Sequence, residues 1–122
     1  MVMSQERRKA PRAAEPIAVA IVDGGGELHA ETKNLSASGA YCVLERFIAP
    51  MTKLALRFEL PNGARRATIQ CSGVVVRSEP IIVHAERGSY YVAIFFTDLA
   101  EQDRAMIKRF VQQRLSAPRS SG

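Results

Sequence analysis

The chain has 122 residues, of which 47% are hydrophobic and 24% are charged. This length fits one domain with a hydrophobic core, and the composition excludes a wholly disordered chain. No apolar run approaches the ~20 residues that span a bilayer, which excludes a membrane-spanning helix. The formal net charge of +5 favours an anionic partner, such as a nucleotide, a nucleic acid, an acidic protein or a membrane surface.

Residues 1–15 carry few apolar side chains and no periodicity. We therefore expect a flexible cationic arm that becomes ordered when it binds a partner. Its first residues lack the apolar stretch of a secretory signal, so we expect a cytoplasmic protein. Beyond the arm, turn residues separate short apolar runs, a spacing that is typical of antiparallel strands. The expected strands are residues 16–22, 27–33, 40–44, 53–60, 67–78 and 89–97.

The clearest strand pattern is that of residues 53–60, where apolar and charged side chains alternate with a period of two. A turn at Pro61-Asn62-Gly63 follows it. Gly73, inside the fifth expected strand, indicates a bulge or a close backbone approach. Residues 79–88 form a longer connection in which Ile81-Ile82-Val83 could extend the neighbouring strands. Residues 89–97 are apolar on both faces, which predicts a central strand with the core on one side and a helix or partner on the other.

From Asp98 onward the periodicity becomes helical. Asp98 is the expected N-cap, and Glu101 three residues later completes a capping-box pattern. The predicted helix, residues 98–115, has its apolar face at Leu99, Met106, Ile107, Phe110, Val111 and Leu115. Its other face carries Arg104, Lys108 and Arg114, which we expect to be solvated. The chain is thus predicted to be mainly β, a six-stranded antiparallel β-barrel whose open end or side is covered by a C-terminal α-helix.

Two short motifs stand out in this pattern. Arg8 and Arg12 form an Arg-x3-Arg motif in the arm, and Asn34, Ser36 and Gly39 form an Asn-x-Ser-x2-Gly motif between the second and third strands. Together they resemble the signature of the PilZ domain, a bacterial receptor family for cyclic di-GMP. The resemblance implies one PilZ-like split-barrel domain over residues 1–122, with the arm at 1–15, the barrel at 16–97, the helix at 98–115 and a tail at 116–122.

The resemblance also implies which residues bind the ligand. A guanidinium group grips a phosphate or a guanine with two hydrogen bonds, which suits the arginines of the arm. The amide of the asparagine faces the guanine edge, the serine brings a small hydroxyl near the ligand, and the glycine serves backbone geometry, because a Cβ would crowd the turn or the ligand. A cation just before the Arg-x3-Arg motif favours a stacked pair of nucleotides over one. The implied site is Arg7, Arg8, Arg12, Asn34, Ser36 and Gly39.

The expected mechanism is closure of the arm over cyclic di-GMP at the barrel mouth, which signals to a downstream protein. Neither a cofactor nor membrane insertion is expected. Substitution of Arg12 or Ser36 by alanine is expected to weaken binding and to leave thermal stability nearly unchanged.

Other functions were weighed from the same residues. His29 and His84 stand apart from any nucleophile or metal-ligand pattern, so catalysis and a metal site are not expected. Flavin-reductase-like split barrels have a related shape, but shape does not supply chemistry. A basic barrel can also bind single-stranded nucleic acid through Tyr41, Tyr90 and Tyr91, although core packing explains these tyrosines equally well. A PilZ-like protein adaptor that binds no nucleotide is the other alternative.

The two cysteines, Cys42 and Cys71, fall within expected strands rather than in a Cys-x2-Cys pair. Such a placement is simplest to read as two buried thiols in a reducing compartment. The sequence leaves open a bridge between neighbouring strands.

Overall fold

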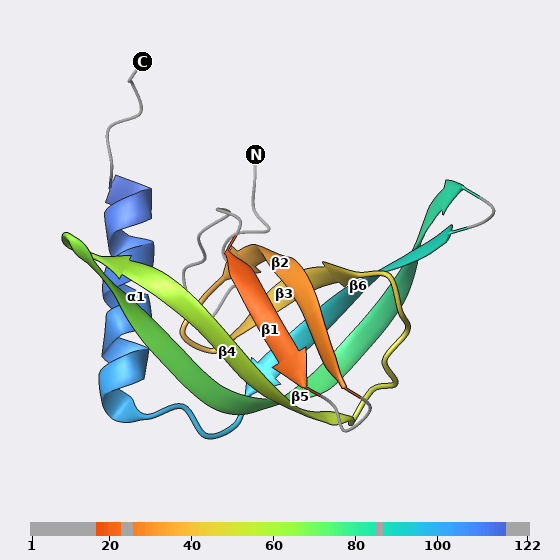
Figure 1. The fold of residues 1–122 in the computed structure, drawn as a ribbon, viewed down its shortest axis with the longest axis horizontal. Coiled ribbons are helices and arrows are strands. Elements are labelled where there is room, and N and C mark those ends of the chain that lie inside the picture. Colours follow the sequence, from red (N-terminus) through yellow and green to blue (C-terminus); the bar gives the residue numbers. More distant parts are fainter. Residues whose placement is uncertain (1–16, 23–25, 85–86, 117–122) are drawn as a thin grey trace, which may run out of the picture.

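The structure, a computed structural model, describes residues 17–22, 26–84 and 87–116. Six antiparallel strands close into a barrel in the order β1, β2, β3, β6, β5, β4, and one helix follows them (Figure 1). The predicted fold class is confirmed, whereas the arm at 1–15 and the tail beyond the helix lie outside the described residues. The elements are β1 (Ala18–Val22), β2 (Glu27–Leu35), β3 (Gly39–Leu44), β4 (Lys53–Asn62), β5 (Arg65–His84), β6 (Arg87–Phe96) and α1 (Glu101–Ser116).

The barrel closes because β1 pairs with β2 on one side and with β4 on the other. Strand β4 follows the predicted alternation, and its inward side chains are buried while the residues between them are exposed. The core also contains a stacked pair, Phe58 and Phe96, with ring centroids 6.2 Å apart. Burial of each large apolar side chain contributes roughly 1.5–3 kcal/mol. The largest fully buried hydrophobic residues are Ile21, Leu35, Leu60, Ile69, Val75, Val92 and Ile107.

The helix α1 stands at one end of the barrel, beside the β4–β5 hairpin (Figure 1). Its buried residues Ile107, Phe110 and Val111 belong to the same core cluster as the strands, as the helical periodicity predicts. Leu115, predicted to lie on this apolar face, is exposed instead, because it comes in the last turn of the helix. The helix is therefore fixed to the barrel by its middle turns.

The predicted capping box at the start of α1 is wrong. The helix begins at Glu101, and its first intrahelical hydrogen bond runs from the Arg104 N–H to the Ala100 carbonyl at 2.9 Å. The Asp98 carboxylate accepts a hydrogen bond from the backbone N–H of Ser72 on β5 at 2.6 Å. Asp98 thus ties the β6–α1 connection to the barrel rather than capping the helix.

Strand β5 extends beyond the predicted residues 67–78, and the predicted extension through Ile81-Ile82-Val83 is confirmed. Strand β5 continues to His84, so that Pro80 pairs with Tyr90 and Ile81 with Ser89. This part of the hairpin projects beyond the barrel (Figure 1). Pairing of β5 with β4 ends at Val74, and a proline is tolerated where a strand has one neighbour instead of two.

Two glycines define the geometry of β5. The turn into it lies at Gly63 and Ala64, whereas the predicted turn was Pro61-Asn62-Gly63. Gly63 adopts a left-handed φ of 66°. At Gly73 a Cβ would lie 2.7 Å from Ile94 Cγ2, so the predicted close approach is confirmed. The register shift of this strand comes separately, between Val75 and Arg77.

Both cysteines are free and buried. Burial raises the pKa of the Cys42 thiol to about 12. Burial, with the nearby carboxylates of Asp98 and Asp103, raises the pKa of the Cys71 thiol to about 11. Both thiols are therefore protonated at neutral pH, which makes them poor nucleophiles.

Candidate functional site

The connection between β2 and β3, residues 36–38, is held by hydrogen bonds of its own. The Ser36 hydroxyl accepts the backbone N–H of Ser38 at 3.1 Å and donates to the Gly39 carbonyl at 3.4 Å. The Ser36 N–H donates to the same Gly39 carbonyl at 2.9 Å. Ser36 is 0% exposed, so its hydroxyl shapes the turn from inside. The resemblance implied a place near the ligand for this hydroxyl, and its removal was expected to leave thermal stability nearly unchanged; its buried hydrogen bonds lead to the opposite expectation for stability.

Two other elements fix the outside of this loop. The Phe96 N–H of β6 donates to the Ser38 carbonyl at 2.9 Å. From α1, Arg104 Nη1 donates to the Ala37 carbonyl, also at 2.9 Å. Arg104 was predicted to be solvated, but it is half-buried and contacts a residue 67 positions earlier in the chain. The loop is thus held by the barrel on one side and by the helix on the other.

Gly39 begins β3 and pairs with Phe95 of β6. A Cβ at this position would collide with the backbone carbonyl oxygen of Ile94. The motif glycine is therefore required by backbone geometry, as its place in the motif implied, although the crowding comes from β6 rather than from a turn or a ligand. The close contact brings the start of β3 tightly against β6.

Asn34 lies on the outer wall of the barrel, near its rim. It is half-exposed, and the next residue, Leu35, is fully buried on the inner side. The strand shifts register between Thr32 and Asn34, after which Asn34 pairs with Tyr41 of β3. Tyr41 in turn pairs with Ala93 of β6. The half-exposed asparagine therefore lies beside β3, one strand away from β6.

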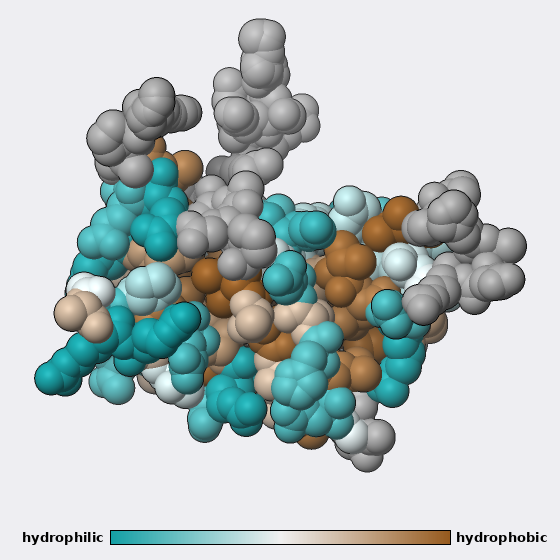
Figure 2. Space-filling view, turned by 45° about the horizontal axis from the view of Figure 1, so that its top comes forward, coloured by the Kyte–Doolittle hydropathy of each residue, from teal (hydrophilic) through white to brown (hydrophobic). Residues whose placement is uncertain are grey.

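The outer face next to Asn34 is unusually apolar. Phe95 on β6 is 50% exposed and Val76 at the bulge of β5 is 55% exposed, with Tyr91 further along β6 at 44%. Apart from these residues, the face seen in Figure 2 shows hydrophobic residues at the surface in the middle of the molecule, bordered by hydrophilic ones. Sequence reasoning did not name Val76 or Phe95 as site residues. The signal that could have found Phe95 was that residues 89–97 are apolar on both faces, whereas Val76 lies outside that run.

The first described residue of the barrel, Ile17, is fastened to the strand that carries Asn34. The Thr32 N–H donates to the Ile17 carbonyl at 2.9 Å, and the Ile17 N–H donates to Thr32 Oγ1 at 3.1 Å. Thr32 is 1% exposed and lies two positions before Asn34. The chain that precedes Ile17 therefore starts from a point close to the motif.

The three arginines of the predicted site, Arg7, Arg8 and Arg12, lie outside the described residues. The structure brings the other three together: Asn34, Ser36 and Gly39 lie on or beside one loop. Ser38 and Gly39 join this loop to β6.

The burial of Ser36 leads to a prediction on stability. Replacing Ser36 by alanine is expected to lower the free energy of unfolding by about 1–2 kcal/mol, because the N–H of Ser38 and the Gly39 carbonyl lose a buried partner. Urea unfolding followed by circular dichroism measures this change. Ser38→Ala is the matched control, since the described contacts of Ser38 run through its backbone. An equal loss in both variants would contradict the assignment.

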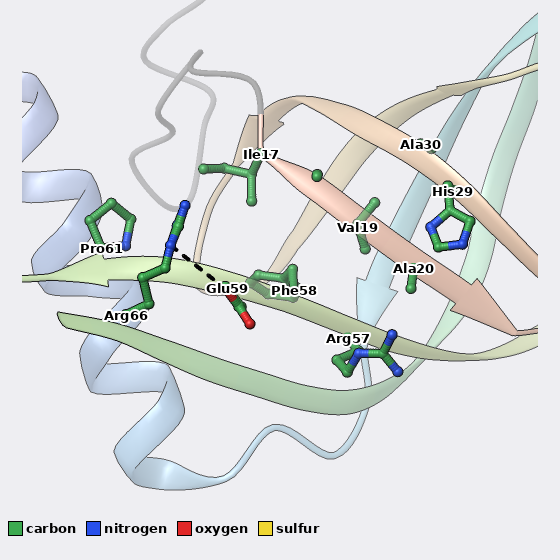
Figure 3. A pocket seen from close by; sticks show the side chains of 11 residues that line it. Ile17, Val19, Ala20, His29, Ala30, Arg57, Phe58, Glu59, Pro61 and Arg66 are labelled. Atoms are coloured by element: carbon green, nitrogen blue, oxygen red, sulfur yellow. Dashed lines mark ion pairs between the residues drawn. The ribbon is translucent and has the colours of Figure 1, made fainter.

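A hollow of about 400 Å³ lies on the outside of β1 and β4 (Figure 3). Ile17, Arg57 and Arg66 are among its lining residues, and none of the described motif residues lines it. Arg66 Nε lies 3.8 Å from Glu59 Oε1 across this hollow. The charges at its wall are thus partly balanced, which weakens its attraction for an anion.

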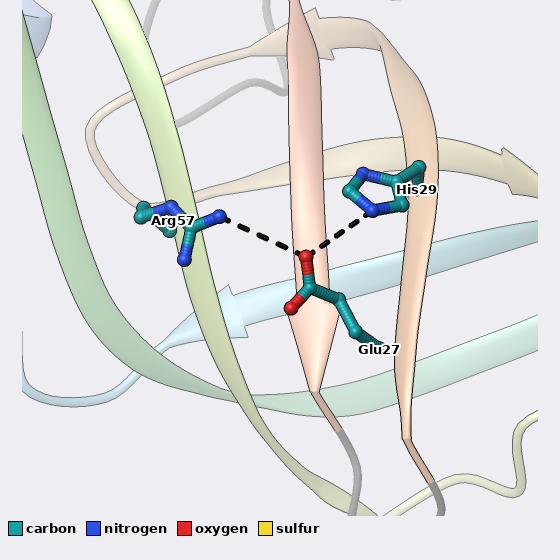
Figure 4. Close-up of polar contacts among 3 residues, drawn as sticks. All are labelled: Glu27, His29 and Arg57. Atoms are coloured by element: carbon teal, nitrogen blue, oxygen red, sulfur yellow. Dashed lines mark ion pairs between the residues drawn. The ribbon is translucent and has the colours of Figure 1, made fainter.

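His29 belongs to a small surface cluster on the same side (Figure 4). Glu27 Oε2 lies 3.1 Å from His29 Nε2 and 3.7 Å from Arg57 Nη2. All three side chains are well exposed, so each contact contributes little, about 0–1 kcal/mol. His29 is therefore a surface residue within this cluster.

The geometry of the loop and the outer wall can be compared with known proteins. The family description of the PilZ domain matches residues 6–113. The chain belongs to the PilZ domain family. Both the motif in the arm and the motif at the β2–β3 loop fall within the matched residues. Comparison with curated protein sequences finds no significant match.

Solved structures of other proteins share the fold. The Bacillus subtilis inhibitor of motility, MotI/DgrA, superposes with a TM-score of 0.80 at 22% identity, over 93% of this chain and 53% of that protein. The PilZ domain of Escherichia coli YcgR with c-di-GMP gives a TM-score of 0.68 at 12% identity, over 89% and 92%. The MrkH–c-di-GMP complex of K. pneumonia gives 0.66 at 18% identity, over 89% and 52%. This PilZ chain spans about half the length of MotI/DgrA and of MrkH.

Within the described part of this PilZ chain, α1 is too short and too polar to cross a membrane. The same residues contain no group of three or more His, Cys, Asp or Glu side chains that could hold a metal ion.

Proposed function

We propose that this PilZ domain is a non-catalytic receptor that binds cyclic di-GMP between its arginine arm and the outer wall formed by β2, β3 and β6. The observation that carries the proposal is the β2–β3 loop, whose motif residues are held in one conformation by hydrogen bonds from within the loop, from β6 and from α1. A loop ordered in this way needs no further ordering when a ligand arrives, which favours binding. Membership of a family of cyclic di-GMP receptors supports the choice of ligand.

Chain length allows the arm to reach this wall. Arg12 comes five residues before Ile17, and five extended residues span at most ~18 Å. Ile17 is hydrogen bonded to Thr32, and Thr32 and Asn34 are separated by at most ~7 Å along the strand. Arg12 therefore has enough chain to contact a ligand that lies over Asn34. Arg8, four residues earlier, has enough to contact the far side of the same ligand.

The wall offers two kinds of contact for a guanine base. The Asn34 amide supplies a donor and an acceptor for the polar edge of the base. Beside it, Tyr41 and the exposed Phe95 and Val76 supply an apolar surface for the ring face. Stacking of a base on an aromatic side chain contributes about 1–3 kcal/mol. These two contacts differ in kind, so the wall discriminates a purine from a simple anion.

Energies explain why both the arm and the wall are needed. Ordering the backbone of residues 7–12 costs about 1–2 kcal/mol for each residue, whereas one charged hydrogen bond returns about 1.5–3 kcal/mol. A single arginine contact does not offset that cost. Several contacts to one ligand with two phosphates and two guanines offset the cost. Arg7 either makes a further contact to this ligand or favours the binding of a second, stacked nucleotide.

The arm then has two states, open without ligand and closed with it, and the closed state presents a new surface to a downstream protein. The likeness to an inhibitor of motility and to the c-di-GMP-binding MrkH is in keeping with a receptor that acts through other molecules. We propose that it works in the cytoplasm, where nucleotide messengers are made.

Isothermal titration calorimetry with cyclic di-GMP tests the proposal. We expect a Kd in the micromolar range or below, which corresponds to a favourable binding free energy of about 8 kcal/mol or more. We expect no heat with GMP, because GMP cannot bridge the arm and the wall. Circular dichroism of the same sample establishes that the protein is folded. Absence of heat from folded protein at tens of micromolar cyclic di-GMP would contradict the receptor function.

One observation favours a second function, the binding of single-stranded nucleic acid. Tyr41, Tyr91 and Phe95 share the outer face of β3 and β6, where they can stack bases, whereas Tyr90 packs against the core and the ring of Phe47. Binding of a single-stranded oligonucleotide with a steep salt dependence, and without competition from cyclic di-GMP, would favour this alternative. Competition by cyclic di-GMP would favour the receptor.

A further inference from the structure

The helix α1 touches the motif loop through one side chain. Arg104, in the first half of the helix, donates from Nη1 to the Ala37 carbonyl at 2.9 Å. Ala37 lies between the motif residues Ser36 and Gly39 and is itself buried. The contact therefore links an element that contains no motif residue to the centre of the motif.

Three consecutive carbonyl groups, two in the loop and one at the start of β3, each have a different partner. The Gly39 carbonyl accepts from Ser36, the Ser38 carbonyl accepts from the Phe96 N–H, and the Ala37 carbonyl accepts from Arg104. The first two partners are short groups fixed by the barrel. The third is a charged side chain, which forms a stronger hydrogen bond than a neutral donor does.

The helix end of this contact is rigid. Ile107, one turn after Arg104, is 0% exposed, and Phe110 and Val111 are buried beside it in the barrel core. A side chain that projects from a fixed helix holds its partner in a defined place. Loss of the guanidinium would leave a partly buried carbonyl without that partner and would let the loop adopt other conformations.

We propose that Arg104 is a positioning residue for ligand binding, which holds the β2–β3 loop in the conformation that binds and couples the occupancy of the site to α1. The inference rests on the proposed function, because it concerns the same site. When the binding conformation of a loop is populated only in part, the apparent affinity falls in proportion to that population. Linkage requires the reverse effect as well, so the ligand stabilises the Arg104 contact and with it the first turns of α1.

The test is calorimetry with cyclic di-GMP on the whole chain and its variants, below the unfolding temperature of every variant. Arg104→Ala is expected to raise Kd about tenfold, which corresponds to about 1.4 kcal/mol. Arg104→Lys is expected to recover part of the affinity, because lysine keeps a charged donor. Lys108→Ala is the matched control: it removes the same charge one turn later on α1, from an exposed side chain, and is expected to bind as the unsubstituted chain does.

A second control separates positioning from general stability. Ile69→Val shortens a fully buried side chain on β5 and lowers the unfolding temperature without touching the loop, so its Kd is expected to stay unchanged. Hydrogen exchange provides a further readout. Cyclic di-GMP is expected to slow exchange of the first amides of α1 in the unsubstituted chain and not in Arg104→Ala.

The outcomes separate the two proposals. If the unsubstituted chain binds cyclic di-GMP and Arg104→Ala binds within twofold of it, the positioning role is overturned and the receptor function stands. An equal loss in Arg104→Ala and Lys108→Ala would also overturn it, because the effect would then be one of overall charge. If the unsubstituted chain does not bind, the receptor function and the inference fall together.

Discussion

Replacing Arg12 by alanine is expected to weaken the binding of cyclic di-GMP about a hundredfold and to leave the unfolding temperature unchanged. A guanidinium that holds a phosphate or a guanine edge makes two charged hydrogen bonds, and their loss corresponds to about 3 kcal/mol. The folded barrel does not depend on this residue, because the core runs from Ile17 to Val111. Calorimetry measures the first quantity and thermal unfolding the second.

Two variants of the arm control this experiment. Lys9→Ala removes the same charge from between Arg8 and Arg12 and is expected to change Kd by less than threefold, the scale of a solvated charge at physiological salt. Arg12→Lys keeps the charge and loses the planar fork, so it is expected to resemble the alanine variant more than the unsubstituted chain. Equal binding by Arg12→Ala and Lys9→Ala would show that the arm attracts the ligand by charge alone.

Replacing Gly39 by alanine is expected to have the largest effect on stability of any substitution in the motif. The added Cβ would overlap the Ile94 carbonyl oxygen, which is part of the β6 backbone and cannot swing away as a side chain does. We expect a loss of about 3 kcal/mol, the upper end of the usual effect of overpacking. For a chain of this size the unfolding temperature would fall by about 10 °C.

Other glycines provide the comparison. At Gly88 a Cβ would lie 3.3 Å from the hydroxyl oxygen at the tip of Tyr90, which can move, so Gly88→Ala is expected to unfold within about 2 °C of the unsubstituted chain. Gly73→Ala is expected to be intermediate, because its nearest neighbour is the Ile94 side chain at 2.7 Å. A Gly39→Ala protein as stable as Gly88→Ala would mean that β3 and β6 separate easily, which contradicts the rigid loop described above.

Local patterns in the sequence were sufficient to predict most strands of the barrel. The alternation in β4 and the turn residues at Gly63 each depend on near neighbours, and the predicted strands correspond to the observed ones. The end of β5 was harder, because Glu79-Pro80 reads as the end of a strand. Proline is accepted there because that part of β5 has lost its pairing with β4, a fact of the three-dimensional arrangement.

The errors at α1 and in the loop have a common physical origin. Asp98 has the spacing of an N-cap, but its carboxylate finds a donor in Ser72, 26 residues earlier in the chain. Arg104 has the spacing of a solvated face, but its guanidinium finds the Ala37 carbonyl. Polar side chains find partners in distant parts of the chain, which no local periodicity encodes. The motif residues themselves came from resemblance to a family, and the binding role of Arg7, Arg8 and Arg12 stays a prediction.

In the proposed mechanism, the two hydrogen bonds between Ile17 and Thr32 fix the point from which the arm is tethered to its own barrel. Because Arg12 is joined to that anchor by a few residues, its effective concentration at Asn34 is on the order of millimolar, whatever the concentration of the protein. The proposed closing of the arm over a bound nucleotide would therefore be a first-order step within one molecule. An arm peptide supplied separately would have to be present at millimolar concentration to cover the bound nucleotide to the same extent. Dilution of the protein would not slow the closing of the tethered arm.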